Sequence, residues 1–334
     1  MLKFMKSFLS SWIVILLFCL SCTQNQQKPQ NSTQSWMAQN GKVKVLSTIA
    51  MIDDLVKSVG GEHVDAMTLI KGELNPHSYQ LVKGDDEKLA FADLVFFNGL
   101  GLEHGPSLQN FLEHNPKSIG LGNQILKNNP ELILNIDGQA DPHIWMDVSL
   151  WSKNLDYIAG AMGKLDPAHS EYYRGNAEKL KGELAKTHES IRNELQEIPA
   201  SQRYLVTSHD AFNYFTRAYL AKESEWQDDS WHDRFAAPEG LAPESQLSAR
   251  HIQLILEFLI KHHVYVLFPE SNVSKDSIKK IIDAGKGKGL DLKISSDYLY
   301  ADAMGEPGSD GDSYQKMIQH NAHVIARHLR KNHP

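Results

Sequence analysis

Four side chains with the chemistry of transition-metal ligands follow predicted strands of this 334-residue chain. These residues are His77, His143, His209 and Asp302. His77 and His143 also each come directly after a proline. Ligands of open α/β sheets bind outside the carboxyl ends of the strands, so these four positions can face one cleft. Three imidazoles and one carboxylate form a closed four-coordinate set for a divalent transition metal. The pattern therefore predicts a metal site, although spacings of tens of residues match no short motif.

Among other candidate residues, Glu270 also ends a predicted strand and has two interpretations. It can hydrogen-bond a ligand imidazole and so orient it, or it can cap the next helix. His320 and His323 are predicted to lie on a solvated helix face with nothing acidic nearby. His104 and His114 flank a predicted turn and helix without further clustering. We therefore assign none of these four histidines to the metal site.

The elements that must position these residues alternate along the chain between short apolar runs and helical stretches. This alternation predicts parallel sheets flanked by helices. The predicted strands are 43–48, 64–70, 94–98, a weaker one at 131–136, 204–207, 264–268 and 292–296. The helices predicted between and after them are 49–59, 85–92, 211–221, 249–261, 274–285 and 313–329.

One further helix is unusually long. Apolar residues at spacings of three and four follow Asp166-Pro167, which is a helix-start pattern, and continue until Pro199. A helix of about 30 residues is about 45 Å long, which exceeds the span of one small lobe. We interpret it as a rigid connection between two lobes. The predicted organisation is a signal peptide at 1–22, a flexible tether at 23–40, an N-terminal lobe at 41–165, the connecting helix at 166–198 and a C-terminal lobe at 199–334.

The first 22 residues have the pattern of an export signal. Two lysines precede an apolar run at 8–20, which is shorter than the ~20 residues that a membrane-spanning helix needs. Cys22 stands where a bacterial lipoprotein signal is lipidated, but Cys19 occupies the position where leucine is usual. Cleavage to a soluble periplasmic protein is therefore the alternative. We expect an exported protein in the periplasm or on the outer face of the cytoplasmic membrane, attached at most through this anchor.

Composition excludes several other classes of protein. Apolar residues make up 41% and charged residues 22% of the chain, which is ordinary for a globular protein. The net charge of −7 and the lack of a basic run argue against a nucleic-acid-binding protein. Both cysteines fall in the signal segment, so the folded body has neither a disulfide framework nor a thiolate metal site.

Four phrases of the sequence are specific when taken together and in this order. They are Asn75-Pro76-His77-Ser78-Tyr79, Asp141-Pro142-His143-Ile144-Trp145-Met146-Asp147, Thr207-Ser208-His209-Asp210-Ala211-Phe212-Asn213-Tyr214-Phe215 and Gly311-Asp312-Ser313-Tyr314. Through these phrases the sequence resembles the TroA-like, or cluster 9, metal-binding receptors of ABC importers, and within them the chlamydial branch. The resemblance runs from about Val43 to the final helix.

The resemblance implies two (βα)-type lobes with parallel sheets, joined by one long rigid helix. It implies a single Mn, Fe or Zn ion in the cleft between the lobes, carried as transported ligand. The family's four ligands fall on His77, His143, His209 and Asp302. The resemblance also implies delivery of the ion to a membrane permease with a cytoplasmic ATPase. We expect a monomer without enzyme activity.

Two departures from the family patterns leave the identity of the bound metal undecided. The stretch 105–140 contains only His114, so the His-rich loop of zinc-specialised relatives is absent. His209 stands where manganese-specialised relatives often have glutamate. The Irving–Williams order favours zinc over manganese or ferrous iron in a test tube. Because imidazoles must be neutral to bind, we expect metal affinity to fall as the pH drops through about 6.5.

Two other functions stay open from the sequence. A secreted metallohydrolase could use three histidines on zinc with Glu270 as a base, but Asp302 would close the fourth position and no His-Glu-x-x-His helix exists. A surface adhesin would need a binding face. The polar stretch 223–243, predicted as a surface loop with Trp226 and Trp231, is the only candidate for one.

Overall fold

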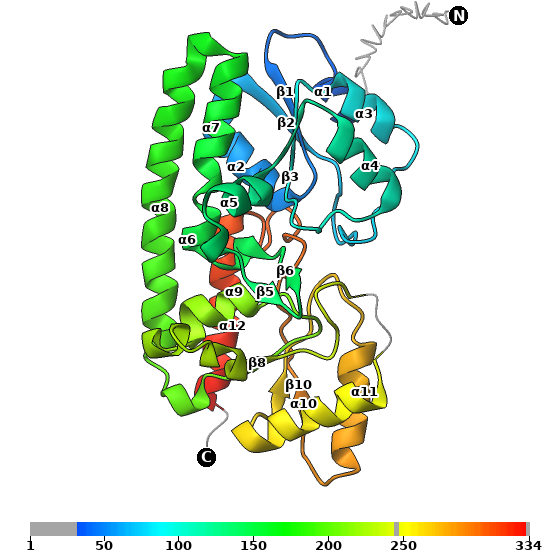
Figure 1. The fold of residues 1–334 in the computed structure, drawn as a ribbon, viewed down its shortest axis with the longest axis vertical. Helices are drawn as coiled ribbons and strands as arrows, with labels where there is room; N and C mark the ends of the chain where they lie inside the picture. The colour runs from blue at the N-terminus through cyan, green and yellow to red at the C-terminus, as the bar shows by residue number, and fades with distance from the viewer. Residues whose placement is uncertain (1–31, 244–246, 332–334) are drawn as a thin grey trace, which may run out of the picture.

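The computed structural model describes residues 32–243 and 247–331 and shows two α/β lobes beside one long helix (Figure 1). In the view of Figure 1 the N-terminal lobe lies above the C-terminal lobe, and the long helix runs along both. Parallel strands pair in each lobe. The predicted fold class is therefore confirmed. The predicted signal peptide, including Cys19 and Cys22, lies outside the described residues.

A parallel sheet with the strand order β2-β1-β3-β4 forms the N-terminal lobe. Every residue of β1 is buried, which is typical of an inner strand of a sheet that is covered on both faces. The first three strands confirm the predicted ones, and β4 is an additional strand. Their bounds are β1 Val43–Ser47, β2 Val64–Thr68, β3 Leu94–Phe97 and β4 Ser118–Gly120.

Helices cover this sheet. Two of them, α2 and α3, confirm predictions, whereas α4, α5 and α7 were not predicted from the sequence. Helix α2 packs against β1, β2 and the long helix α8, and α7 packs along α8. The bounds are α2 Ala50–Gly60, α3 Asp85–Phe91, α4 Pro106–His114, α5 Leu121–Asn128, α6 Val148–Trp151 and α7 Asn154–Leu165.

The ordered body begins earlier than the predicted tether allows. Helix α1 (Ser32–Trp36) falls inside the range 23–40. The indole of Trp36 is buried, donates a hydrogen bond to the backbone oxygen of Asp65 at 2.8 Å and packs edge-on against Phe91. One aromatic side chain with a site to bury against is sufficient to order a segment whose overall composition is polar.

Helix α8 (Ser170–Gln196) is the predicted long helix, and a short 3₁₀ turn at Pro167–His169 precedes it. Asp166 makes no capping hydrogen bond from its side chain to the backbone of this turn. Its carboxylate instead accepts hydrogen bonds from the Tyr173 hydroxyl at 2.6 Å and from His169 Nδ1 at 2.7 Å. The apolar stripe faces the protein as the spacing predicts. Its buried residues are Tyr173, Ala177, Leu180, Leu184, Thr187, Ile191 and Leu195.

Because packing of this stripe holds α8 in place, we expect Ile191→Ala to lower the free energy of unfolding by about 2–5 kcal/mol. Ile191 is 2% exposed and belongs to the main hydrophobic core. The midpoint of urea-induced unfolding measures the change. Lys186→Ala, on the exposed face of the same helix, is the matched control and should leave the midpoint almost unaltered. Equal stability of the two variants would contradict the packing role of the stripe.

The C-terminal lobe contains short parallel strands in two pairs, β7 with β8 and β9 with β10. A backbone hydrogen bond from Phe268 to Val206 links the two pairs. The predicted helix at 211–221 forms as a short α9 that continues into a π-helix at Thr216–Leu220. The remaining bounds are β7 Leu205–Val206, β8 Phe235–Ala236, β9 Val266–Leu267, β10 Lys293–Ile294, α9 Asn213–Phe215, α10 Ala249–His262, α11 Asp276–Lys286 and α12 Tyr314–Lys331.

Two sequence predictions need correction. The weak strand at 131–136 is not part of the sheet, because β5 (Asn135–Ile136) pairs antiparallel with β6 (Gln139–Ala140) in a small hairpin. The stretch 223–243 is not simply a polar surface loop. Trp231 is buried at 1% exposure. Ion pairs and hydrogen bonds within the stretch fix its path, and aromatic burial stabilises it.

The last helix joins the two lobes. The backbone N–H of Tyr314, at the start of α12, donates a hydrogen bond to the Asp54 carboxylate of α2 at 3.1 Å. Its hydroxyl donates to the backbone oxygen of Trp145 at 2.7 Å. The range 199–334 therefore returns to pack on the N-terminal lobe.

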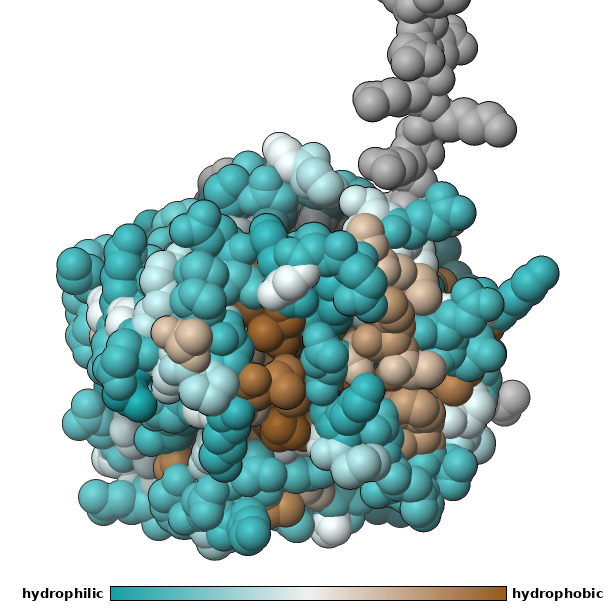
Figure 2. Space-filling view, turned by 90° about the horizontal axis from the view of Figure 1, so that it is seen from above, coloured by the Kyte–Doolittle hydropathy of each residue, from teal (hydrophilic) through white to brown (hydrophobic). Residues whose placement is uncertain are grey.

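The end of the molecule that Figure 2 shows is mostly hydrophilic. Figure 2 shows hydrophobic side chains gathered in a hollow and a band on one end of the molecule, surrounded by hydrophilic ones. Within the part of the chain that the structure describes, no helix combines the length and the apolar character needed to cross a membrane.

Candidate metal centre

The fold brings the four predicted ligands together. His77 lies in the loop after β2, His143 follows the β5–β6 hairpin, His209 follows β7, and Asp302 lies in the loop after β10. One side-chain ligand atom from each residue lies within 4.8 Å of the others. All four residues are buried, the most exposed being Asp302 at 3%.

The three imidazoles present the same atom to the centre. The Nε2 atoms of His77, His143 and His209 lie 3.7, 3.4 and 3.3 Å from the nearest carboxylate oxygen of Asp302. These three nitrogens and Oδ1 of Asp302 are buried without a hydrogen-bond partner among the described residues. Buried polar atoms that lack a partner are rare, and four that converge on one point fit an ion at that point. Neutral imidazoles with one carboxylate suit manganese, iron or zinc.

The shared Asx-Pro-His pattern has a local structural cause. The backbone N–H of His77 donates to Oδ1 of Asn75 at 2.8 Å, and that of His143 donates to Oδ1 of Asp141 at 2.9 Å. Each is a turn closed by an Asn or Asp side chain two residues earlier. The proline between fixes one backbone dihedral. Each imidazole therefore starts from a defined backbone position.

Buried carboxylates orient two of the three rings. Nδ1 of His143 hydrogen-bonds Oδ1 of Asp141 at 2.7 Å, and Nδ1 of His209 hydrogen-bonds Oε2 of Glu270. Because a carboxylate only accepts, each Nδ1 carries the hydrogen and each Nε2 keeps its lone pair for a metal. Glu270 therefore contacts a ligand imidazole, whereas α11 begins only at Asp276 and is not capped by it. Asp141 was not predicted, although its position two residues before a ligand histidine is a usable signal.

Charge coupling at the centre is strong. Burial opposes the charged form of His143, but the adjacent Asp141 carboxylate, together with Asp302, raises its pKa to about 9. Burial likewise opposes charge on His209, but Glu270 and Asp302 hold its pKa well above the usual range. Burial dominates at His77 and lowers its pKa to about 3. Despite its burial, Asp302 has a pKa well below the usual range because the imidazoles surround it.

We expect Glu270→Gln to weaken metal binding by about 10- to 100-fold, the usual effect of losing an outer carboxylate partner. The amide keeps the shape but removes the negative charge that supports the His209 imidazole. Isothermal titration with zinc measures the dissociation constant. Glu306→Gln, at a residue of the loop before α12 outside the metal centre, serves as the matched control. An unaltered constant in Glu270→Gln would contradict the orienting role.

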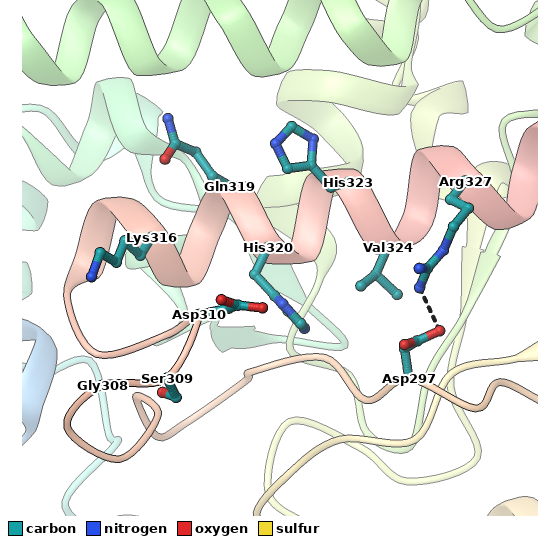
Figure 3. Close-up of a pocket in the computed structure, with 10 residues that line it drawn as sticks. All are labelled: Asp297, Gly308, Ser309, Asp310, Lys316, Gln319, His320, His323, Val324 and Arg327. Atoms are coloured by element: carbon teal, nitrogen blue, oxygen red, sulfur yellow. Dashed lines mark ion pairs between the residues drawn. The ribbon is translucent and has the colours of Figure 1, made fainter.

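A surface cavity of about 620 Å³ lies along α12, away from the four ligands (Figure 3). The contacts of the residues that line it correct the prediction that His320 and His323 have no acidic neighbours. His323 Nδ1 hydrogen-bonds Glu194 of α8 at 2.7 Å, and His320 Nε2 hydrogen-bonds a backbone oxygen at 3.0 Å. Arg327 pairs with Asp297, as the dashed line in Figure 3 shows. These polar groups already have partners within the protein, so they do not indicate a ligand site.

The known proteins that this chain is most readily compared with are metal-binding proteins, in agreement with the geometry of the centre. A family model described as ZnuA, zinc-uptake complex component A periplasmic, matches residues 45–328. The sequence is 37% identical over 287 residues to the metal-binding protein YtgA of Chlamydia trachomatis, covering 86% of each chain. It is 32% identical to the manganese-binding lipoprotein MntA of Bacillus subtilis, covering 86% of this chain and 90% of that one.

Solved structures agree. The Fe(III)-bound YtgA of Chlamydia trachomatis superposes with a TM-score of 0.81 at 37% identity, covering 86% of this chain and 98% of that one. The periplasmic zinc-binding protein TroA of Treponema pallidum superposes with a TM-score of 0.77 at 29% identity, covering 86% and 99%. The resemblance to TroA-like receptors, and to their chlamydial branch, is thereby confirmed. The chain therefore belongs to the ZnuA family.

Proposed function

We propose that this chain is an extracytoplasmic solute-binding protein that captures one Mn, Fe or Zn ion and delivers it to an ABC permease with a cytoplasmic ATPase. The proposed ligands are His77, His143, His209 and Asp302. The observation that carries the proposal is the convergence of four buried, unpartnered ligand atoms from both lobes. A site formed between two lobes suits a carrier, because movement of the lobes would change access to the ion.

The same site argues against the metallohydrolase. Such an enzyme needs an open coordination position for water and a free base beside it. Asp302 is placed to fill the fourth position. The base that the sequence suggested, Glu270, already accepts hydrogen bonds from the backbone N–H groups of Ser208 and His209 and from the His209 ring. A fully engaged carboxylate is a poor proton acceptor, so the geometry favours a receptor.

The adhesin also lacks support. Its candidate face depended on Trp226 and Trp231. Trp231 is buried, and the indole of Trp226 donates a hydrogen bond to the backbone oxygen of Arg217 at 2.7 Å. The guanidinium groups of Arg192 and Arg217 also lie 5.2 and 5.6 Å from the Trp226 ring. Both aromatic side chains are therefore used within the protein.

For localisation we propose export and attachment at one end through a lipid on Cys22. The export pattern of 1–22 and the periplasmic description of the family support this. Mass spectrometry of the protein purified from the membrane fraction should find an N-terminal Cys22 that carries acyl chains. A lighter protein that is released with the periplasmic contents would instead support the alternative cleavage without lipid.

Metal competition tests the function. The purified protein is stripped with a chelator, then offered manganese, ferrous iron and zinc at equal concentration, and its metal content is counted by elemental analysis. We expect one ion per chain, with zinc preferred in vitro by the Irving–Williams order. Hydrolysis of ester or peptide substrates by the loaded protein would favour the enzyme. A protein that retains no ion would refute the receptor.

A further inference from the structure

A fourth imidazole, that of His104, lies at the mouth of the metal centre. Its ring centroid is 5.6 Å from that of His77, and both residues line a cavity of about 350 Å³. Leu241 of the C-terminal lobe and Gln139 of the β5–β6 hairpin line the same cavity, which therefore lies between the lobes. The sequence alone predicts no clustering for His104, and the structure corrects this prediction.

The His104 ring is held so that one nitrogen can accept a metal ion. Its Nδ1 lies 3.1 Å from the backbone oxygen of Gly101. Because a carbonyl oxygen only accepts, Nδ1 carries the hydrogen, and Nε2 of the neutral ring keeps a lone pair. No hydrogen bond or ion pair joins this Nε2 to any other residue that the structure describes. The side chain is half-buried, so it is accessible from the cavity.

The loop that carries His104 has an uncommon backbone. Residues 99–101 all have positive φ, and the middle one is Leu100, at 55°. A leucine rarely adopts this conformation. The buried carboxylate of Glu103 holds the turn by accepting hydrogen bonds from the backbone N–H groups of residues 98–99, at 2.8 and 3.0 Å. Strain of this kind persists where the surroundings require one particular position, and here that position places an imidazole at the mouth.

The His77 ring is held less firmly than the other two ligand imidazoles, which suits transfer of a metal ion to and from it. Carboxylates hold the rings of His143 and His209 through Nδ1. Among the described residues no carboxylate contacts Nδ1 of His77, and only its backbone N–H is fixed, by Asn75. The ligand beside His104 is therefore the one whose ring is least restrained.

We propose that His104 is a transient metal ligand, which receives the ion at the mouth of the cleft and passes it to His77. This inference rests on the proposed function of the buried centre. A group that contacts the ion only during passage lowers the barrier for uptake and for release equally. It therefore accelerates both steps and leaves the equilibrium affinity unaltered.

Stopped-flow fluorescence with zinc tests this directly. The Trp145 ring lies 5.3 Å from the His143 ring, so its emission reports on binding. Mixing with zinc gives the uptake rate constant, and mixing the loaded protein with excess chelator gives the release rate constant. In His104→Ala and His104→Gln we expect both constants to fall by the same factor, on the order of tenfold. The dissociation constant and the content of one ion per chain should not change.

His114→Ala is the matched control, because His114 is exposed at the end of the helix that follows the same loop. Its rates should equal those of the unaltered protein. Unaltered rates in both His104 variants would overturn the proposal. A change in release alone, with a matching change in the dissociation constant, would also overturn it, because His104 would then stabilise the bound state. If the unaltered protein fails to bind zinc at all, the proposed function itself fails, and the two failures are thus distinguished.

Discussion

Replacing His209 with alanine should lower the affinity for zinc by about two orders of magnitude. Binding at a four-ligand zinc site is worth about 10–16 kcal/mol, so one ligand accounts for about 3 kcal/mol, and each 1.4 kcal/mol is tenfold. The loss is expected to be at least this large because Glu270 would remain buried without the imidazole that it now contacts. Competition against a chromophoric chelator of known affinity measures the dissociation constant.

His114→Ala serves here as well, since the exposed His114 ring hydrogen-bonds within its own helix, to the backbone oxygen of Asn110 at 2.8 Å. It should bind zinc with unaltered affinity. Circular dichroism of both variants without metal checks that His209→Ala is folded. A folded His209→Ala that binds zinc as tightly as the control would rule out the four-ligand centre, in which His209 supplies one of the four ligand atoms.

The second large effect is the dependence of metal binding on pH. Above its pKa an imidazole is neutral and can bind, and below it a proton must be displaced. The pKa of His143 is raised to about 9 and that of His209 is raised well above its usual range, so both rings hold protons at neutral pH in the empty centre. His77, with a pKa lowered to about 3, and Asp302, whose pKa is well below its usual range, release none.

We therefore expect about two protons to leave per zinc ion bound near pH 7, and affinity to rise by up to about 100-fold per pH unit in this range. The rise should flatten as the pH approaches 9, where His143 becomes neutral without metal. The pH range over which metal affinity changes is therefore expected to lie above the value of about 6.5 that unperturbed histidine implies. Proton release in weakly buffered solution and dissociation constants from pH 5.5 to 8.5 measure it. An affinity that is independent of pH would contradict the coupling.

Much of the fold followed from local patterns. The strands 43–48, 64–70 and 94–98 and the long helix were predicted because each is a run whose period or apolar content is visible in one window of sequence. Helix α7 was not, because Gly160 and Gly163 lower its helix propensity. Gly163 lies against Ser170 so closely that a Cβ would come within 2.6 Å of the Ser170 hydroxyl. Packing against α8 therefore decides this helix, and packing is not a local property.

The sequence by itself determined which residues are the candidate ligands of the centre. His77, His143, His209 and Asp302 are chemically suited to a metal and lie after strands, and the carboxyl ends of parallel strands meet at one edge. Their order along the chain also placed two on each side of the long helix.

Only the tertiary structure decided how those ligands are supported and reached. The hydrogen bond of Glu270 to His209 joins residues 61 positions apart, and the contact of His104 with His77 joins two separate loops. Burial of Trp231, which removed a candidate binding face, likewise depends on neighbours that are distant in sequence. Such contacts are set by how whole elements pack, and side-chain burial and pKa follow from that packing, so residue type and spacing do not contain them.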